Sequence, residues 1–242
     1  MRKQIRSLLG GRARLLAAAL LVVMLSTAFA ADKPGVPPDE AMVRLKAGNV
    51  RFVKSNRKPV NYVAERAALV KDQHPYAILL VCSDSRVPPE LVFDESLGRL
   101  FIVRVAGNVV DTVALGSIEY GVDILGARLL VVLGHQSCGA VKETLKGGQF
   151  PPNIAAIVRK IQPAADRAKE RGLGPEATLK LAIEENVRQQ IHDALAGSEI
   201  LRDRVGRVER DGKARLTITG GVYDLASGKV VWQMADAAVA SK

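Results

Sequence analysis

The stretch Tyr76-Ala-Ile-Leu-Leu-Val81, followed at once by Cys82-Ser-Asp84-Ser-Arg86, indicates how this chain folds. A short, nearly continuous apolar run is typical of a strand that is buried on both faces of a parallel sheet. Two similar runs follow, at Leu100–Val105 and Arg128–Leu133, and the spacing of apolar residues between them predicts a helix over Thr112–Leu125. A strand, a helix and a strand in this order predict a right-handed crossover and therefore an α/β fold.

The segments around these strands complete the predicted fold. Before them, Asp39–Phe52 has the spacing of an N-terminal docking helix, and Val63–Asp72 that of a second helix. After them, the loop Lys146–Asn153 precedes helices predicted over Ile154–Lys169 and Pro175–Ala196, and two runs separated by a Gly-Gly break, Arg215–Ile218 and Lys229–Trp232, are predicted to be one or two edge strands. We expect a mainly parallel central sheet of about four to five strands, flanked by helices.

Composition is that of an ordinary globular protein with one substantial core. The chain has 242 residues, of which 48% are hydrophobic and 25% charged, and with only 4% aromatic residues the core must be mainly aliphatic. The formal net charge of +10 would by itself suggest an anionic partner such as nucleic acid or a membrane. The distribution of the basic residues argues against that interpretation.

Residues 1–30 have the parts of a secretory signal peptide. A basic segment precedes the apolar run Leu15–Leu25 and the small-residue motif Ala28-Phe29-Ala30, after which we expect cleavage. The five basic residues of this segment leave with it, so the mature charge is +10 − 5 = +5. We therefore expect no nucleic-acid partner, no stable membrane association after cleavage, and export to the periplasm of a Gram-negative bacterium or an equivalent space. An uncleaved signal anchor is the alternative. The proline-rich residues 31–38 are predicted to be a linker, and 39–242 a single domain.

Three potential metal ligands follow the predicted strands. Cys82 comes just after one strand and His135 just after another, at the edge of an open parallel sheet where ligand sites form. Cys138 lies three residues further, on the predicted opening turn of a helix. Two thiolates and an imidazole suit zinc, with the fourth position left open as in catalytic sites. A disulfide between Cys82 and Cys138 is the alternative in an exported protein, and we expect it only as an oxidised, metal-free form.

The two motifs C-x-D-x-R (82–86) and H-x-x-C (135–138) resemble those of the beta class of carbonic anhydrases. The resemblance extends over nearly all of the mature chain, through Leu45-Lys-Ala-Gly48-Asn49, Arg104-Val-Ala-Gly-Asn108, Ile118-Glu119-Tyr120, Glu185-Asn186-Val187 and Gly220-Gly221-Val-Tyr223-Asp224. It implies one Zn2+ per chain, bound by Cys82, His135 and Cys138, and a catalytic dyad of Asp84 and Arg86. The implied reaction is the reversible hydration of CO2 to bicarbonate.

The chemistry of these residue types agrees with that reaction. Zinc lowers the pKa of a bound water, and the hydroxide so formed attacks the carbon of CO2. Two thiolates cancel the charge of the metal, so we expect a less acidic water than in a site of three histidines, and an enzyme that favours alkaline pH. Asp84 can accept a hydrogen bond from the hydroxide, and Arg86 can hold that carboxylate in a bidentate pair. A surface ion pair at a turn is the structural alternative for these two residues.

The resemblance also implies substrate-binding residues. Gln73, Phe101 and Tyr120 match residues that line the substrate cavity in a plant-like subclass, and Gly139 would let the backbone approach closely. Gln73 precedes the strand that delivers Cys82, and at about 3.3 Å per residue its neighbour His74 should be roughly 26 Å from the metal of its own subunit. If Gln73 touches substrate, it must do so across a subunit boundary, so we expect a homodimer or tetramer.

Two further functions remain possible on the sequence alone. One is the hydrolysis of a CO2 analogue such as carbonyl sulfide or carbon disulfide, because the same zinc ligands serve that reaction and the mouth of the pocket decides the substrate. The other is a non-catalytic zinc-binding protein.

Overall fold

The computed structural model describes residues 35–233, so the predicted signal peptide at 1–30 lies outside the described residues. Five strands form one sheet in the order β2-β1-β3-β4-β5. The first four are parallel to their neighbours, and β5 is antiparallel to β4. The strands are β1 (Ala77–Val81), β2 (Leu100–Arg104), β3 (Leu129–His135), β4 (Thr217–Tyr223) and β5 (Val230–Gln233). The expected α/β fold with a mainly parallel sheet is confirmed.

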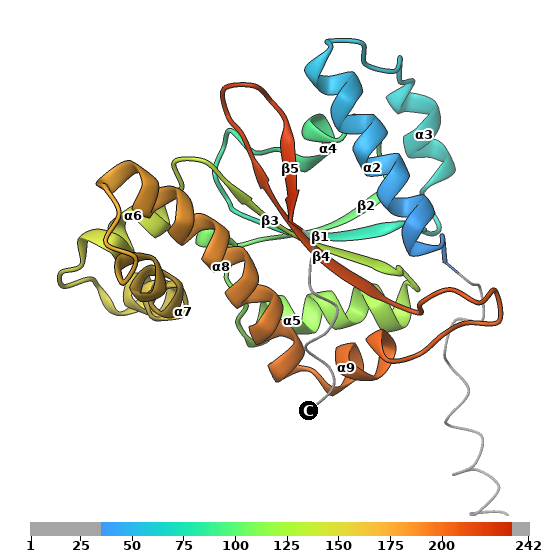
Figure 1. Cartoon of the computed structure of the whole chain (residues 1–242). Helices are drawn as coiled ribbons and strands as arrows, with labels where there is room; N and C mark the ends of the chain where they lie inside the picture. Colours follow the sequence, from blue (N-terminus) through green and yellow to red (C-terminus); the bar gives the residue numbers. More distant parts are fainter. Residues whose placement is uncertain (1–34, 234–242) are drawn as a thin grey trace, which may run out of the picture. The chain divides into compact units, whose positions relative to one another are not determined.

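Helices cover both faces of the sheet, as Figure 1 shows. The helices α5, α8 and α9 lie on one side of it, and α2, α3 and α4 on the other. Their bounds are α2 (Pro38–Val53), α3 (Tyr62–Ala68), α4 (Pro89–Val92), α5 (Thr112–Glu119), α6 (Gly139–Lys146), α7 (Pro152–Lys169), α8 (Pro175–Gly197) and α9 (Glu199–Val205). Between residues 35 and 233, no helix is long and apolar enough to cross a membrane.

The alternation of side chains along each strand divides the core into two layers. Ile78 and Leu80 of β1 pack with Leu130 of β3 against the side of α5, α8 and α9. Leu79 and Val131 point to the opposite layer, which α2 and α4 complete. All the residues of β1 and β3 are buried, as their apolar runs predicted. The same prediction is wrong for β2, which is only partly buried because it lies at the edge of the sheet and has one neighbouring strand.

Several element boundaries differ from those predicted. The docking helix α2 begins at Pro38, one residue before the predicted start, because a proline is tolerated in the first turn of a helix. The helix predicted over Thr112–Leu125 is α5 followed by a π-helical turn, η2 (Tyr120–Ile124). The strand β3 continues to His135, so this residue is the last of the strand and does not follow it.

The predicted break at Gly220-Gly221 is wrong. Strand β4 runs through both glycines and lies between β3 and β5, so only β5 is a C-terminal edge strand. The reason is close packing of α8 on the sheet: a Cβ atom on Gly220 would come within 2.5 Å of the Val187 side chain. Here glycine allows a helix to approach a strand and does not interrupt it.

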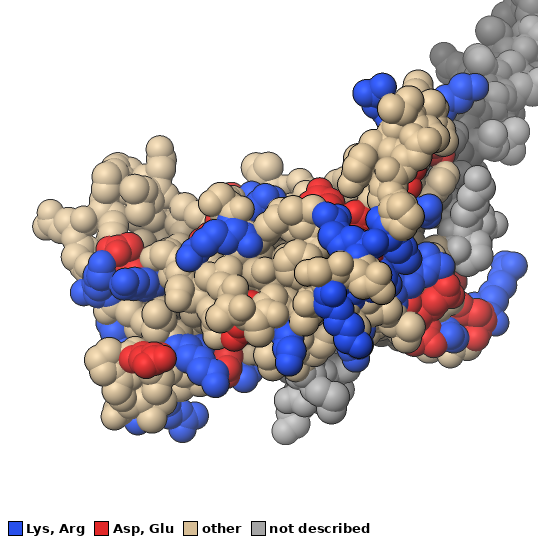
Figure 2. Space-filling model, turned by 90° about the horizontal axis from the view of Figure 1, so that it is seen from above, with Lys and Arg blue, Asp and Glu red and all other residues tan. Residues whose placement is uncertain are grey.

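Acidic and basic side chains are mixed on the surface. On the face shown in Figure 2, aspartates and glutamates lie among the lysines and arginines. Over the surface of the described residues, acidic and basic side chains form ion pairs between neighbouring helical turns, such as Arg44 with Glu40 and Lys146 with Glu143.

Candidate metal centre

The register of two neighbouring strands brings the predicted metal ligands together. Strands β1 and β3 are parallel, with Val81 opposite Leu133. Cys82 follows Val81, and His135 ends β3 two residues after Leu133. Cys138 caps the N-terminus of α6. The ligand atoms of Cys82, His135 and Cys138 all lie within 4.8 Å of one another.

The donor set and its surroundings fit a zinc ion. Cys82, His135 and Cys138 are 5%, 0% and 1% exposed, and both cysteines are free thiols. The Nε2 atom of His135 is buried and has no hydrogen-bond partner among the described residues. A buried polar atom without a partner is costly, and a metal bound between the three side chains would satisfy it. Two sulfurs and one imidazole nitrogen are ligands that zinc prefers.

The two thiols are electrostatically unequal. The Cys138 thiol donates to the Cys82 sulfur and lowers the pKa of Cys82, and His135 and the backbone N–H of Gly107 lower it further, against the effect of burial. The pKa of Cys138 is raised, because its thiol donates a hydrogen bond to Cys82, because it is buried, and because the charge of the Cys82 thiolate disfavours a second thiolate beside it. The pair therefore favours a thiolate at Cys82, which is the form that binds metals.

A backbone carbonyl fixes the orientation of His135. Its Nδ1 atom lies 2.8 Å from the carbonyl oxygen of Gln136, so the proton is held on Nδ1 and the Nε2 lone pair faces the two cysteines. Two bonds hold Gln136 in turn. Its N–H donates to the carbonyl of Tyr223 at 2.9 Å, and its side-chain amide donates to Asp224 at 2.6 Å.

Asp84 lies beside this centre and is held by Arg86. The guanidinium donates to both carboxylate oxygens, at 2.9 and 2.7 Å, and the backbone N–H of Arg86 donates to Oδ1 at 2.9 Å. These bonds keep the pKa of Asp84 well below its usual range, so the carboxylate is ionised at neutral pH. Asp84 Oδ2 lies 3.8 Å from His135 Nε2. The carboxylate is thus next to the atoms that would hold the metal.

Arg104 also contributes to the centre, and the sequence reasoning assigned it no role. Its side chain donates to the carbonyl of Cys82 at 3.2 Å and to that of Asp84 at 2.7 Å, and so holds the turn that carries both residues. The available signal was its position at the carboxyl end of β2, the strand beside β1. Gly107, in the turn that follows β2, was missed in the same way, and its N–H donates to Cys82 Sγ at 3.3 Å.

The predicted substrate-binding residues divide into two groups. Gly139 opens α6 next to Cys138, and a Cβ atom there would meet nothing within 4 Å, so packing within one chain does not require glycine at this position. Phe101 lies opposite Ile78 in the amino-terminal half of β2, with its ring 6.1 Å from that of Tyr120. Gln73 is exposed and precedes β1. Within one chain, these last three residues lie toward the end of the sheet opposite to the cysteines.

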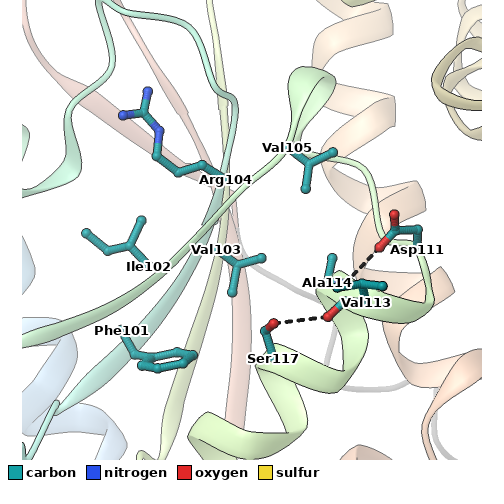
Figure 3. Close-up of a pocket in the computed structure, with 9 residues that line it drawn as sticks. All are labelled: Phe101, Ile102, Val103, Arg104, Val105, Asp111, Val113, Ala114 and Ser117. Carbon is teal, nitrogen blue, oxygen red and sulfur yellow. Dashed lines mark hydrogen bonds between the residues drawn. The ribbon is translucent and has the colours of Figure 1, made fainter. Parts of the chain in front are cut away.

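A groove of about 340 Å³ runs along the β2 edge, as Figure 3 shows, and it is separate from the cysteine cluster. Phe101 and Arg104 of β2 line one side, and Val113 and Ser117 of α5 the other. Asp111 caps α5 by accepting from the N–H of Ala114 at 2.7 Å. None of the three potential metal ligands lines this groove.

Comparison with known proteins identifies similar sequences over most of the chain. A family model described as carbonic anhydrase matches residues 77–230. The chain is 37% identical over 204 residues to carbonic anhydrase 2 of Mycobacterium tuberculosis, an alignment that covers 82% of this chain and 94% of that protein. It is 33% identical over 179 residues to a carbonic anhydrase of Pseudomonas aeruginosa, which covers 67% of this chain and 75% of that one.

Solved structures share the fold. The beta-carbonic anhydrase CcaA is similar with a TM-score of 0.61 at 26% identity, over 79% of this chain and 94% of that one. One of two beta-carbonic anhydrases of Sordaria macrospora, described as tetrameric, matches with a TM-score of 0.64 at 21% identity, over 81% of this chain and 96% of that one. At that identity, the second similarity concerns the fold alone.

Proposed function

This chain belongs to the beta class of carbonic anhydrases and catalyses the reversible hydration of CO2, and we propose that it does so with one zinc ion held by Cys82, His135 and Cys138. The observation that carries the zinc proposal is the convergence of these three buried side chains, with an unpartnered imidazole nitrogen among them. The two other functions that the sequence left open are not favoured, because the similar proteins are carbonic anhydrases.

The role that we propose for each residue follows from the geometry of the site. When bound, zinc would lower the pKa of a water molecule and so supply hydroxide, at a more alkaline pH than a site of three histidines. Asp84, which lies beside the three potential ligands, would accept a hydrogen bond from the attacking group and so orient it toward CO2. For this it must be ionised, and the two side-chain bonds from Arg86 both keep it ionised and fix its plane. Gly139 is exposed at the start of α6, next to Cys138, where a substrate could reach it.

The experiment that tests this function measures metal and activity on the same sample. The full chain is expressed, its zinc content is determined by mass spectrometry, and CO2 hydration is followed by stopped flow with a pH indicator. We expect one zinc per chain and an activity that disappears with a chelator and returns with zinc. Activity that survives complete removal of zinc would contradict the proposal.

We also propose that the active enzyme is at least a homodimer joined through the β2 edge. Strand β2 is an edge strand, and exposed apolar side chains surround it: Val113, Tyr120 and Ile124 are 78%, 48% and 47% exposed. An edge strand with such a surface is suited to pairing with a second copy. A second subunit there would bring Gln73, Phe101 and Tyr120 toward its partner's metal centre. A described tetramer among the proteins of this fold is consistent with such assembly.

Mixed dimers test this arrangement. Gln73→Ala subunits are combined with Cys82→Ser subunits, each of which is impaired alone. In the hybrid, one site has an intact Cys82 from one subunit and an intact Gln73 from the other, so half of the sites should recover. No recovery in hybrids of demonstrated composition, or full activity from a demonstrated monomer, would refute the shared site.

Export to the periplasm is proposed from the sequence of residues 1–30 alone. Cleavage after Ala30 predicts that the mature protein begins at Ala31, and N-terminal sequencing of the protein from the periplasmic fraction checks it. An intact N-terminus in the membrane fraction would instead indicate a retained anchor.

A further inference from the structure

A buried polar network connects the middle of α8 to the metal centre. Asn186 and Gln190 lie one turn apart on α8 and are 1% and 0% exposed. The Gln190 side-chain amide donates to Asn186 Oδ1 at 3.0 Å and to the carbonyl of Lys160 at 3.3 Å. Burying two side-chain amides in the protein interior costs free energy unless they are hydrogen-bonded. These two amides are hydrogen-bonded to each other and to backbone groups.

The network holds the two ends of one turn. Asn186 Nδ2 donates to the carbonyl of Gly107 at 2.9 Å, and Gln190 Oε1 accepts from the N–H of Val110 at 2.8 Å. The turn between them has an unusual backbone, because Gly107 and Asn108 have φ angles of +70° and +46°. A non-glycine residue in this region is held there by its surroundings, and the two amides of α8 provide that support.

The turn directs one N–H at a potential metal ligand. Gly107 donates to Cys82 Sγ at 3.3 Å. An N–H that points at a ligating sulfur fixes the position of the sulfur and partly neutralises its charge. Packing leaves this turn little freedom to move toward the helices, because a Cβ atom on Gly107 would come within 2.6 Å of Ile161 in α7 and 3.2 Å of Ala140 in α6.

We propose that Asn186 and Gln190 are positioning residues of the metal centre, which act by holding the 107–110 turn so that the Gly107 N–H stays on Cys82. The inference rests on the proposed zinc site. Neither residue is hydrogen-bonded to Cys82, His135 or Cys138. Arg104 of β2 and Gly107 in the turn after β2 donate hydrogen bonds to Cys82, whereas Asn186 and Gln190 of α8 hold that turn.

Matched variants separate positioning from general stability. Gln190→Met has similar volume but loses all three bonds, and Asn186→Ala removes the bond to Gly107. Gln189→Met is the control on the same helix, because Gln189 bonds Arg167 and Asp193 and not the turn. Asn49→Ala is the second control: it removes another buried amide, whose partners are Val92, Gly228 and Val230 and lie outside the 107–110 turn.

Two readouts are taken on each full-length protein. The zinc dissociation constant is measured by competition with a chromogenic chelator, and amide hydrogen exchange of Gly107 and Val110 is measured in the zinc-free protein. We expect zinc affinity to fall about 10-fold in Gln190→Met and Asn186→Ala, at the lower end for partners of ligating residues, with faster exchange of the turn. Both controls should keep the wild-type affinity, even though Asn49→Ala unfolds more easily.

The outcomes distinguish the inference from the function on which it rests. Unchanged zinc affinity in both network variants, with faster exchange of the turn, would overturn the positioning role while leaving the zinc site intact. The same would follow if Asn49→Ala lost affinity equally, since the effect would then be one of stability. A wild-type chain that binds no zinc would overturn the proposed function and this inference with it. If Gln190→Met does not fold, Asn186→Ala carries the test.

Discussion

The substitution Asn49→Ala should destabilise the protein by about 3 kcal/mol. Asn49 lies on α2, is 6% exposed and makes three bonds to backbone groups. Its amide nitrogen donates to the carbonyls of Val92 at 3.0 Å and Gly228 at 2.9 Å, and its Oδ1 accepts from the N–H of Val230 at 3.0 Å. At about 1 kcal/mol for each of the three hydrogen bonds, the sum is about 3 kcal/mol.

The fluorescence of the single tryptophan, Trp232, can report this loss of stability. Trp232 lies on β5, near the backbone that Asn49 holds, and its ring centre is 6.0 Å from that of Phe93. Urea unfolding followed by Trp232 fluorescence, at one fixed protein concentration, gives the free energy directly. For a domain of this size, about 3 kcal/mol corresponds to a fall in the melting temperature of roughly 6–12 °C.

A matched control and an activity measurement complete the test. Lys46→Ala, an exposed change on the same helix, should alter the free energy of unfolding by less than about 0.5 kcal/mol. Folded Asn49→Ala protein should hydrate CO2 at the wild-type rate per bound zinc, because Asn49 bonds neither the cysteines nor Asp84. A loss below about 1 kcal/mol would refute the claim that these three bonds anchor α2 to α4 and to the β4–β5 hairpin.

Three further predictions concern the metal centre and the pH dependence of stability. Cys138→Ser should lose most of its zinc and all activity, because a hydroxyl is a far poorer zinc ligand than a thiolate, and metal analysis showing full occupancy would disprove the assignment. Asp84→Asn should keep its zinc but lose about 100-fold in kcat/KM by stopped flow, as expected when an oriented electrostatic partner is removed; near-normal turnover would exclude Asp84 from the mechanism. The buried Arg128 lowers the pKa of Asp211 from 3.8 to about 2. The stability that this ion pair contributes is therefore complete above about pH 4 and is lost as the pH falls toward 2. Asp211→Asn should flatten the pH dependence of the free energy of unfolding in that range, and an acid-unfolding curve that stays unchanged would count against this prediction.

The sequence alone was enough for the fold class and for the potential metal ligands. The apolar runs that became β1 and β3 are buried along their whole length, as predicted, whereas β2 is only partly buried because it lies at the edge of the sheet. Once these strands are parallel, the residues at their carboxyl ends share one edge of the sheet. That rule places Cys82 near His135 although 53 residues separate them, because local pattern and a general topological constraint are sufficient here.

Interactions between distant segments could not be predicted in this way. The Gly220-Gly221 pair has the local signature of a break, and only the approach of Val187 from α8 explains why a strand runs through it. In the same way, Gly107 was visible in a motif, but its bond to Cys82 depends on a turn that Asn186 holds from α8. Neither the uninterrupted strand β4 nor the hydrogen bond from Gly107 to Cys82 can be predicted from the neighbouring sequence, since each results from the packing of a helix against the sheet.

Gln73 and Asn49 show the same difference between what the sequence predicts and what tertiary contacts decide. That Gln73 is far from its own Cys82 follows from counting residues along β1, because a strand has a fixed rise per residue. The three partners of Asn49, by contrast, come from segments about 43 and 180 residues away, and a side-chain amide carries no information about which backbone groups it will bond. Spacing and strand order could therefore be derived from the sequence, whereas the hydrogen bonds that hold the centre and the docking helix in place were decided by the tertiary structure.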